Sequence, residues 1–323
     1  MSAMKKCLVV CMVLSLFASS VFAAGTQETA VNWPTKPVSV LIPANVGGDT
    51  DTTFRTLSQS ISKEIGQPVT LNNMSGGAGS VATYELLNYD ADGYMGMWHH
   101  YDTILLTMKG MMDKRYDEYL DIAAVVPVTG GEYMLLTNKA SGLNNFNDII
   151  TYAKANPGKL VIATEAGGYN HLFSAYFAEK AGIDVNIVDF GSAANRIAAL
   201  VGNQCQILFG TYDNYKGYKN DLNCIACAAE TRKEYAPDIP TIKELGYDIF
   251  SEKFYLFGFK KGTDPKIVEK MGTAIKNAVA SDAGKKVFEK YQYTAEVLTG
   301  KAALDRCKQF EEKYKDSIYL LKK

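Results

Sequence analysis

Short apolar runs alternate along this chain with longer segments whose apolar residues recur at helical spacing. The apolar runs predict strands at Val38–Ile42, Val69–Asn72, Tyr94–Trp98, Ala123–Val128, Tyr133–Thr137, Leu160–Ala163, Ile187–Val188, Cys205–Phe209 and Asn223–Ala228. The helical spacing predicts helices at Thr52–Ile65, Ser80–Asn88, Phe146–Asn156, Asn170–Ala181, Ala193–Val201 and Ile242–Leu245. Because strands and helices alternate, we expect an α/β protein whose parallel sheets are covered by helices on both faces.

The segment after Thr263 has a different pattern, rich in Lys and Glu. It predicts amphipathic helices at Lys266–Ala280, Asp282–Tyr291 and Lys301–Leu321. Pro265 suits the first turn of a helix, and Ser281 can cap the next one. Since no Pro- or Ser-rich linker interrupts the chain, we expect strands to connect any two domains.

The first 23 residues have the pattern of an export signal. Lys5 and Lys6 precede an uncharged apolar stretch, Cys7–Phe17, and Val21–Ala23 offers a cleavage site with small residues. We therefore expect a signal peptide at residues 1–23 and export of the remainder to the periplasm. The alternative is a membrane anchor, for which this apolar stretch is short.

The charge of the chain limits the kinds of molecule that it can bind. The formal net charge of −1 provides no electrostatic surface for nucleic acid, so we expect no nucleic-acid partner, and we expect a monomer.

Four cysteines follow the expected signal peptide: Cys205, Cys224, Cys227 and Cys307. Positions 224 and 227 would face opposite sides of a strand, which favours buried thiols over a disulfide between them. A disulfide to Cys205 is the alternative.

Two glycine-rich turns each stand between a strand and a helix. The first contains Asn45, Gly47 and Gly48, and the second reads Gly76, Gly77, Ala78 and Gly79. Such turns direct free backbone N–H groups to one point, with the positive end of a helix dipole behind them. We expect both turns to bind a small carboxylate through backbone amides rather than arginine side chains. Ordinary tight turns are the alternative.

Hydroxyl and carboxyl side chains accompany both turns. Thr50 and Ser80 can donate to a ligand or cap the helices that follow. Asp49 and Asp51 would repel an anion, so we interpret them as helix caps or as acceptors for a ligand amine. Acid–base catalysis by the two carboxylates is disfavoured, because no nucleophile or set of metal ligands stands near them.

Two adjacent histidines, His99 and His100, end a predicted strand. Open α/β sheets bind ligands at the carboxyl ends of their strands. Either one histidine donates a hydrogen bond to a ligand, or both lie on the surface at a helix start. Adjacent histidines on an extended chain diverge, and no further ligands stand at suitable spacing, so we expect no metal and no cofactor.

A third glycine turn, Gly167 and Gly168, lies in the second half of the chain. Tyr169 and Asn170 begin the helix after it, and we expect both to close over a ligand. The next residue, His171, either packs at the helix start or contacts the solute. Weaker candidates for the cleft rim, which follow later strands, are Gly191, Ser192 and Asp213.

Five ordered motifs carry a resemblance to a known family. They are the Pro43 and Gly47-Gly48 turn with Asp51, Asn73 with the second glycine turn, Asp92-Gly93-Tyr94, the Pro-Thr-x-x-Glu-Leu-Gly segment Pro240–Gly246, and Gly262–Pro265. In these motifs the chain resembles the solute-binding proteins of the tripartite tricarboxylate transporter family, also called Bug receptors. The resemblance extends over residues 33–323.

The resemblance implies a type II periplasmic-binding-protein fold, in which two α/β lobes enclose a ligand cleft. We expect residues 33–130 plus 250–323 in lobe 1 and residues 131–249 in lobe 2, with crossings near Val128–Tyr133 and Phe250–Phe257. The family implies an organic acid as ligand, here a di- or tricarboxylate or an acidic amino acid. It also implies membrane transporter subunits as partners.

Two other functions stay open at this point. An exported enzyme could use the histidines with Asp49 or Asp51 as acid and base, although no hydrolase, phosphate-loop or zinc-protease motif occurs in the chain. A sensory role would present the ligand-closed surface to a partner without transport.

Overall fold

The computed structural model describes residues 31–322, of which residues 34–322 belong to one structural unit. The expected signal peptide, residues 1–23, lies outside the described residues. Within residues 31–322, no helix has both the length and the apolar character needed to span a membrane.

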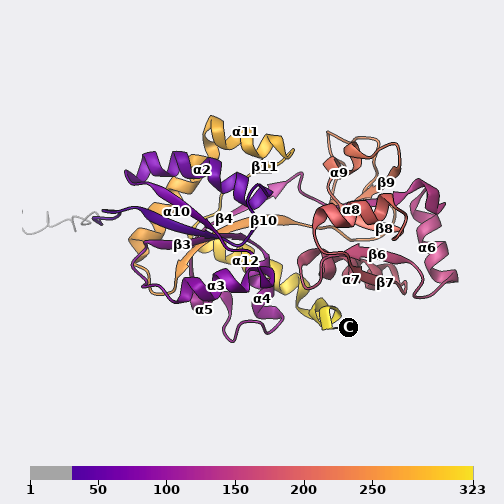
Figure 1. The fold of residues 1–323 in the computed structure, drawn as a ribbon, viewed down its shortest axis with the longest axis horizontal. Helices are drawn as coiled ribbons and strands as arrows, with labels where there is room; N and C mark the ends of the chain where they lie inside the picture. The colour runs from indigo at the N-terminus through magenta and orange to yellow at the C-terminus, as the bar shows by residue number, and fades with distance from the viewer. Residues whose placement is uncertain (1–30, 323) are drawn as a thin grey trace, which may run out of the picture. The chain divides into compact units, whose positions relative to one another are not determined.

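The first sheet combines strands from both ends of this unit (Figure 1). In spatial order its strands are β11 (Thr294–Ala295), β4 (Leu120–Thr129), β10 (Lys253–Lys260), β3 (Met95–His100), β1 (Val38–Ile42) and β2 (Val69–Asn73). Strand β1 runs parallel to β2 and β3, whereas β10 runs antiparallel to β3 and β4. The carboxyl ends of β1, β2 and β3 therefore meet at one edge.

Helices cover both faces of the first sheet (Figure 1). On one side lie α2 (Asp49–Ile65), α10 (Pro265–Ala280) and α11 (Asp282–Lys290). On the other lie η1 (Gly77–Gly79), α3 (Ser80–Leu87), α4 (Asp102–Met108), α5 (Tyr116–Tyr119) and α12 (Gly300–Tyr314), which continues as η3 (Lys315–Lys322). Helix α2 is anchored by Phe54, whose ring stacks on Trp98 and Phe257 at centroid distances of 5.0 and 5.7 Å.

The second sheet is formed by the middle of the chain. Its strands, in spatial order, are β7 (Asn186–Asp189), β6 (Val161–Thr164), β8 (Ile207–Gly210), β5 (Met134–Asn138) and β9 (Leu222–Cys227). Its helices are η2 (Lys139–Ser141), α6 (Phe146–Ala155), α7 (Tyr169–Ala181), α8 (Ala193–Val201) and α9 (Tyr212–Gly217). Strand β6 runs parallel to β7 and β8, and β5 runs antiparallel to β8 and β9.

Strand alternation assigns each face of the second sheet to a different core. Met134 and Leu136 pack in the cluster that holds Leu200 of α8. Leu135, between them, packs in the cluster that holds Phe173 of α7. Because successive strand residues point to opposite faces, α7 and α8 cover opposite sides, and β5 is buried along its whole length.

The sheets are mixed rather than parallel as expected. The chain passes from the first sheet to the second between Thr129 and Met134, and it returns between Cys227 and Lys253. Strands β5 and β10 begin at these crossings, and each runs against its two neighbours. The division into lobes of residues 33–130 plus 250–323 and residues 131–249 stays a prediction.

Other local predictions differ from the structure in instructive ways. The expected helix at Ile242–Leu245 is only a turn, because Gly246, with φ of 95°, ends it after the mutual capping of Thr241 and Glu244. The short helices α4, α5 and α9 were not predicted. The four cysteines within the described residues are free, so the alternative of a disulfide to Cys205 is wrong, and burial raises the pKa of each thiol to about 12.

Candidate ligand-binding site

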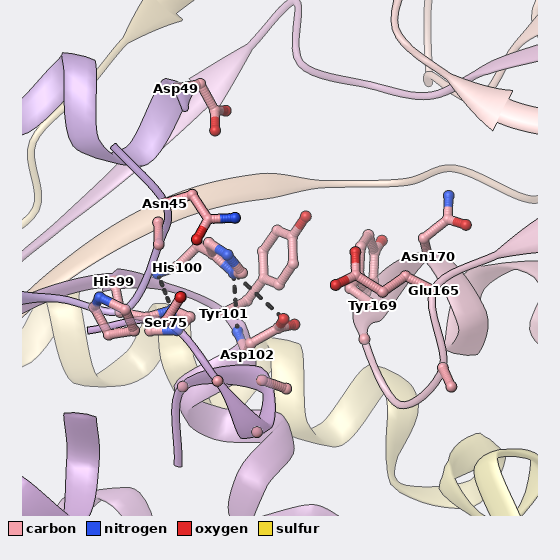
Figure 2. Close-up of a pocket in the computed structure, with 18 of the residues that line it drawn as sticks. Asn45, Asp49, Ser75, His99, His100, Tyr101, Asp102, Glu165, Tyr169 and Asn170 are labelled. Carbon is pink, nitrogen blue, oxygen red and sulfur yellow. Dashed lines mark hydrogen bonds and ion pairs between the residues drawn. The ribbon is translucent and has the colours of Figure 1, made fainter. Parts of the chain in front are cut away.

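A cavity of about 450 Å³ lies at the carboxyl ends of β1, β2, β3 and β6. Its volume is in the range of small-molecule sites, and its position follows the rule for open α/β sheets. Figure 2 shows side chains from residues 45–102 on one side of it and from residues 165–170 on the other. Both halves of the chain therefore contribute to one site.

The second glycine turn, after β2, lines this cavity from Ser75 to Gly79. Its internal hydrogen bonds use the N–H groups of Gly79 and Ser80. Within the described residues, the N–H groups of Ser75, Gly76 and Gly77 donate to no protein acceptor. Three vacant amides in a cavity wall form an arrangement that suits a carboxylate.

The first glycine turn, after β1, has the N–H groups of Gly47, Gly48 and Thr50 occupied. The Gly47 N–H donates to Asp51 Oδ2 at 2.9 Å, and the Thr50 N–H donates to Asp49 Oδ1 at 2.8 Å. The Gly48 N–H donates to Asn45 O at 3.3 Å. Of the residues from Asn45 to Thr50, Asn45 and Asp49 line the cavity. Their N–H groups have no acceptor within the described residues, but they are not consecutive, so this turn presents no continuous row of free amides.

The Asp51 carboxylate holds the two turns together. It accepts hydrogen bonds from Arg55, at 2.5 Å, and from Asn73 Nδ2, at 3.0 Å, besides that from Gly47. Asn73 Nδ2 also donates to Ala44 O at 3.0 Å. Burial acts to raise the pKa of Asp51, but the hydrogen bonds lower it overall. Asp51 is thus ionised and structural, and it does not line the cavity.

Asp49 faces a cation from the crossing strand β10. Its carboxylate accepts from Lys253 Nζ and from the Tyr255 hydroxyl, the latter at 3.1 Å. Burial alone would raise the pKa of Asp49, yet Lys253, with smaller effects of His100 and Tyr255, lowers it below the usual range. The Asp49 carboxylate and the Lys253 ammonium therefore neutralise each other.

His99 is buried, with 1% of its surface exposed. Burial, and next the neighbouring His100, lower its pKa well below the ordinary 6.5. The ring is therefore neutral, and since Nδ1 accepts from the His100 N–H at 2.7 Å, the proton is on Nε2. Within residues 31–322, Nε2 has no hydrogen-bond partner. This N–H is a buried donor that faces Gly79.

Gly79 is required beside this ring. Its φ is 96°, and a Cβ atom on it would lie 2.3 Å from His99 Nε2. Only glycine therefore allows the turn and the histidine to pack together.

The opposite wall comes from the start of α7. Gly168 is the N-cap of this helix and has no side-chain cap. The Tyr169 hydroxyl is engaged by Tyr314 at 2.7 Å and by the Glu252 N–H at 3.1 Å. Asn170 Nδ2 donates to the Phe209 carbonyl at 2.9 Å, while its Oδ1 has no partner within the described residues.

One arginine reaches the cavity from α8. Arg196 Nη1 donates to Glu165 Oε2 at 2.9 Å and to the Gly191 carbonyl at 2.7 Å. Both Arg196 and Glu165 line the cavity. Because this guanidinium already has a carboxylate partner, capture of the ligand by backbone amides rather than by an arginine stays a prediction.

The sequence model of the tripartite tricarboxylate transporter family receptor matches residues 53–314. The chain belongs to this receptor family. The curated relative BugT from Bordetella pertussis is 26% identical over 279 residues, which cover 84% of this chain and 85% of BugT.

Solved structures of similar fold agree. The periplasmic binding protein BugD aligns with a TM-score of 0.71 and 21% identity over 88% of this chain and 98% of BugD. MatC from Rhodopseudomonas palustris, solved with bound malate, aligns with a TM-score of 0.73 and 20% identity over 90% of this chain and 100% of MatC. The family resemblance and the type II fold, two α/β lobes with a cleft between them, are confirmed.

More than half of the residues predicted to bind ligand line the cavity of this receptor. They are Asn45, Asp49, Gly76, Gly77, Ala78, Gly79, His99, His100, Gly168, Tyr169 and Asn170. Ala78 adopts a φ of 53°, which is uncommon for a residue with a side chain. These residues follow four separate strands. The rule that open α/β sheets bind ligands at the carboxyl ends of their strands therefore located them.

The other predicted residues do not line the cavity: Gly47, Gly48, Thr50, Asp51, Ser80, Gly167, Gly191, Ser192 and Asp213. Several have local partners instead. The Gly167 N–H donates to His171 Nδ1 at 3.2 Å, Ser192 accepts from the Asn195 N–H as the cap of α8, and Asp213 pairs with Lys216 at 2.7 Å.

Sequence reasoning missed other residues of the receptor cavity. They are Pro43, Ala44, Ser75, Tyr101, Asp102, Tyr133, Glu165, Ala166 and Arg196. Most directly precede or follow a predicted candidate, so extending each strand-end segment by two residues would have found them. Arg196 has only its place one helical turn after Ser192 as a signal. Within residues 31–322, no group of three or more His, Cys, Asp or Glu side chains could hold a metal ion.

Proposed function

We propose that the receptor captures a small organic acid in the periplasm and delivers it to a tripartite membrane transporter. The observation that supports this most is the row of vacant amides at Ser75, Gly76 and Gly77 in a cavity wall. A desolvated carboxylate costs several kcal/mol unless donors replace its water. Backbone amides can do so without a mobile cation.

Relatives support the ligand class and the partner. MatC was solved with malate, and the family is described as receptors of a tricarboxylate transporter. We infer that the cavity-lining residues named above form the binding site and that the two lobes of residues 33–130 plus 250–323 and 131–249 close on the ligand. Closure then presents one surface to the membrane subunits. The chain works as a monomer after removal of residues 1–23.

Two measurements test this proposal. Mass spectrometry of small molecules released from the receptor, purified from the periplasm, should identify an organic acid. A thermal-shift series with mono-, di- and tricarboxylates should then raise the melting temperature, since a ligand at 100 times Kd stabilises by about 2.7 kcal/mol. Recovery of chemically altered ligand would favour an enzyme, and the absence of any stabilising organic acid would overturn the proposal.

A further inference from the structure

The carboxyl-terminal segment of the chain, α12 followed by η3, packs against elements of both sheets. Helix α12 contacts β4 and α4 at the first sheet, and η3 contacts α7 at the second. Tyr314, the last residue of α12, is fully buried where the two parts meet. This segment therefore connects the two sheets in addition to the two crossings of the chain.

Aromatic rings of α12 support two tyrosines of the cavity. Phe310 stacks on Tyr101, with ring centroids 5.4 Å apart, and its ring lies 5.8 Å from that of Tyr169. Tyr314, one turn later, meets Tyr169 edge to face at 5.5 Å. Tyr101 and Tyr169 line the cavity, with their own rings 4.4 Å apart. Because neither Phe310 nor Tyr314 is a lining residue, any effect that they have on a ligand passes through the two tyrosines.

The Tyr169 hydroxyl is a junction of three segments. It is hydrogen-bonded to the Tyr314 hydroxyl at 2.7 Å, and it accepts the Glu252 N–H at 3.1 Å. The Glu252 carboxylate in turn pairs with Arg306 of α12 and, at 3.2 Å, with Lys313. Since Tyr169 is the first residue of α7, this one hydroxyl joins α7 to α12 and to the chain that enters β10.

The bond between the two hydroxyls is buried and does not depend on pH in the ordinary range. Burial raises the pKa of both Tyr169 and Tyr314 well above the ordinary 10, so both stay protonated.

Loss of this bond has a defined consequence for the cavity wall. Without it, we expect the first turn of α7 to spend part of its time away from the position at which Gly168 and Asn170 line the cavity. Apparent affinity then falls in proportion to the fraction of molecules in which the wall is in place.

We propose that Tyr314 is a positioning residue of the ligand site: its hydroxyl holds Tyr169, and thereby the first turn of α7, opposite the vacant amides of the second glycine turn. The inference rests on the proposed function, because it requires one ligand to contact both walls of the cavity. It adds the carboxyl-terminal segment to the parts of the receptor that determine affinity, although Tyr314 does not line the cavity.

Removal of single hydroxyl groups tests this role. Tyr314→Phe keeps the ring and deletes the bond to Tyr169. Tyr319→Phe is the matched control, since it deletes a hydroxyl of η3 that donates to Glu179 of α7 at 3.3 Å, outside the cavity. Calorimetric titration at pH 7.5 uses whichever of malate, succinate and citrate binds the wild type most tightly. Tyr314→Phe should weaken this binding about fivefold, and Tyr319→Phe should leave it within about twofold of the wild type.

A double-mutant cycle distinguishes positioning from a merely structural role. Tyr169→Phe removes the same bond from the cavity side and should weaken binding at least as much as Tyr314→Phe. In the Tyr169→Phe background, Tyr314→Phe should change the affinity by less than about twofold, because the hydroxyl through which it acts is already gone. Additive losses of affinity would show that Tyr314 acts by another route, and they would overturn the inference.

The outcomes separate this inference from the proposed function. If Tyr314→Phe lowers the urea concentration of unfolding but leaves the affinity within about twofold of the wild type, the inference fails while the proposed function stands. Equal losses of affinity for Tyr314→Phe and Tyr319→Phe would also overturn it. If none of the three acids binds the wild type, the inference fails together with the proposed function. If Tyr314→Phe does not fold, Tyr169→Phe decides, since an unchanged affinity in that variant overturns the inference and a loss of about fivefold supports it.

Discussion

The two glycine turns that follow β1 and β2 have similar sequences but different roles. In the first turn, the carboxylates of Asp51 and Asp49 take the N–H groups of Gly47 and Thr50. In the second turn, the N–H groups of Ser75, Gly76 and Gly77 have no protein acceptor within the described residues. The first turn is held by its own carboxylates, whereas the second presents consecutive free N–H groups to the cavity.

The difference teaches that a glycine-rich strand–turn–helix segment predicts where amides gather, not whether they are free. Acidic side chains in the first turn of the following helix decide this, because they can fold back onto the turn. Helix α2 begins with Asp49 and Asp51, whereas α3 has no acidic residue in its first turn.

The largest expected loss of stability comes from replacing one glycine by alanine, and it should differ between the two turns. Gly79→Ala forces both a left-handed φ and a clash with His99, and should lower the free energy of unfolding by about 3 kcal/mol. Gly47→Ala has the same φ problem but nothing within 4 Å of its Cβ, so it should cost about 1–2 kcal/mol. Urea unfolding measures both. Equal losses would contradict the distinct packing of the two turns.

The second-largest loss of stability is expected when the Asp51 carboxylate, which holds the first turn, is removed. Asp51→Ala leaves the Gly47 N–H and the Asn73 amide without their acceptor, and should destabilise the receptor by about 2–3 kcal/mol. Asp305→Ala, which breaks an exposed pair with Lys301, should change stability by about 0.5 kcal/mol or less. If the two variants unfold at the same urea concentration, the first turn is not braced by Asp51.

A smaller effect follows from the neutral ring of His99. Its pKa is lower in the folded than in the unfolded protein, so the unfolded chain binds more protons below about pH 6.5. Its contribution to stability is therefore lost as the pH falls. Between pH 7.5 and 5.5 the wild type should lose about 1.4 kcal/mol more than His99→Gln. Parallel stability profiles for the two proteins would show that the ring is protonated when folded.

The smallest effect is expected at Gly48. Its φ is −67°, and a Cβ would approach only the Asn45 carbonyl, at 3.4 Å. Gly48→Ala should change stability and ligand affinity by about 0.5 kcal/mol or less. A tenfold loss of affinity in titration would mean that the first turn does approach the ligand closely.

Much of this fold could be predicted from sequence, because hydrophobic period and turn residues are local signals. The strands β1 and β2 and the helix α8 lie where the pattern placed them. The mixed direction of the sheets could not be predicted, since it depends on where the crossing strands enter. Strand-end positions located the cavity, but long-range partners determine what its side chains do. The Tyr169 hydroxyl, for example, is engaged by Tyr314, 145 positions later.

The central claim is that the second glycine turn, and not the first, holds the ligand carboxylate. A crystal structure of the receptor with the organic acid that stabilises it most tests this directly. We predict carboxylate oxygens within about 3 Å of the backbone nitrogens of Ser75, Gly76 and Gly77. A carboxylate held by the Gly47–Gly48 turn, with the amides of the second turn still vacant, would contradict the account.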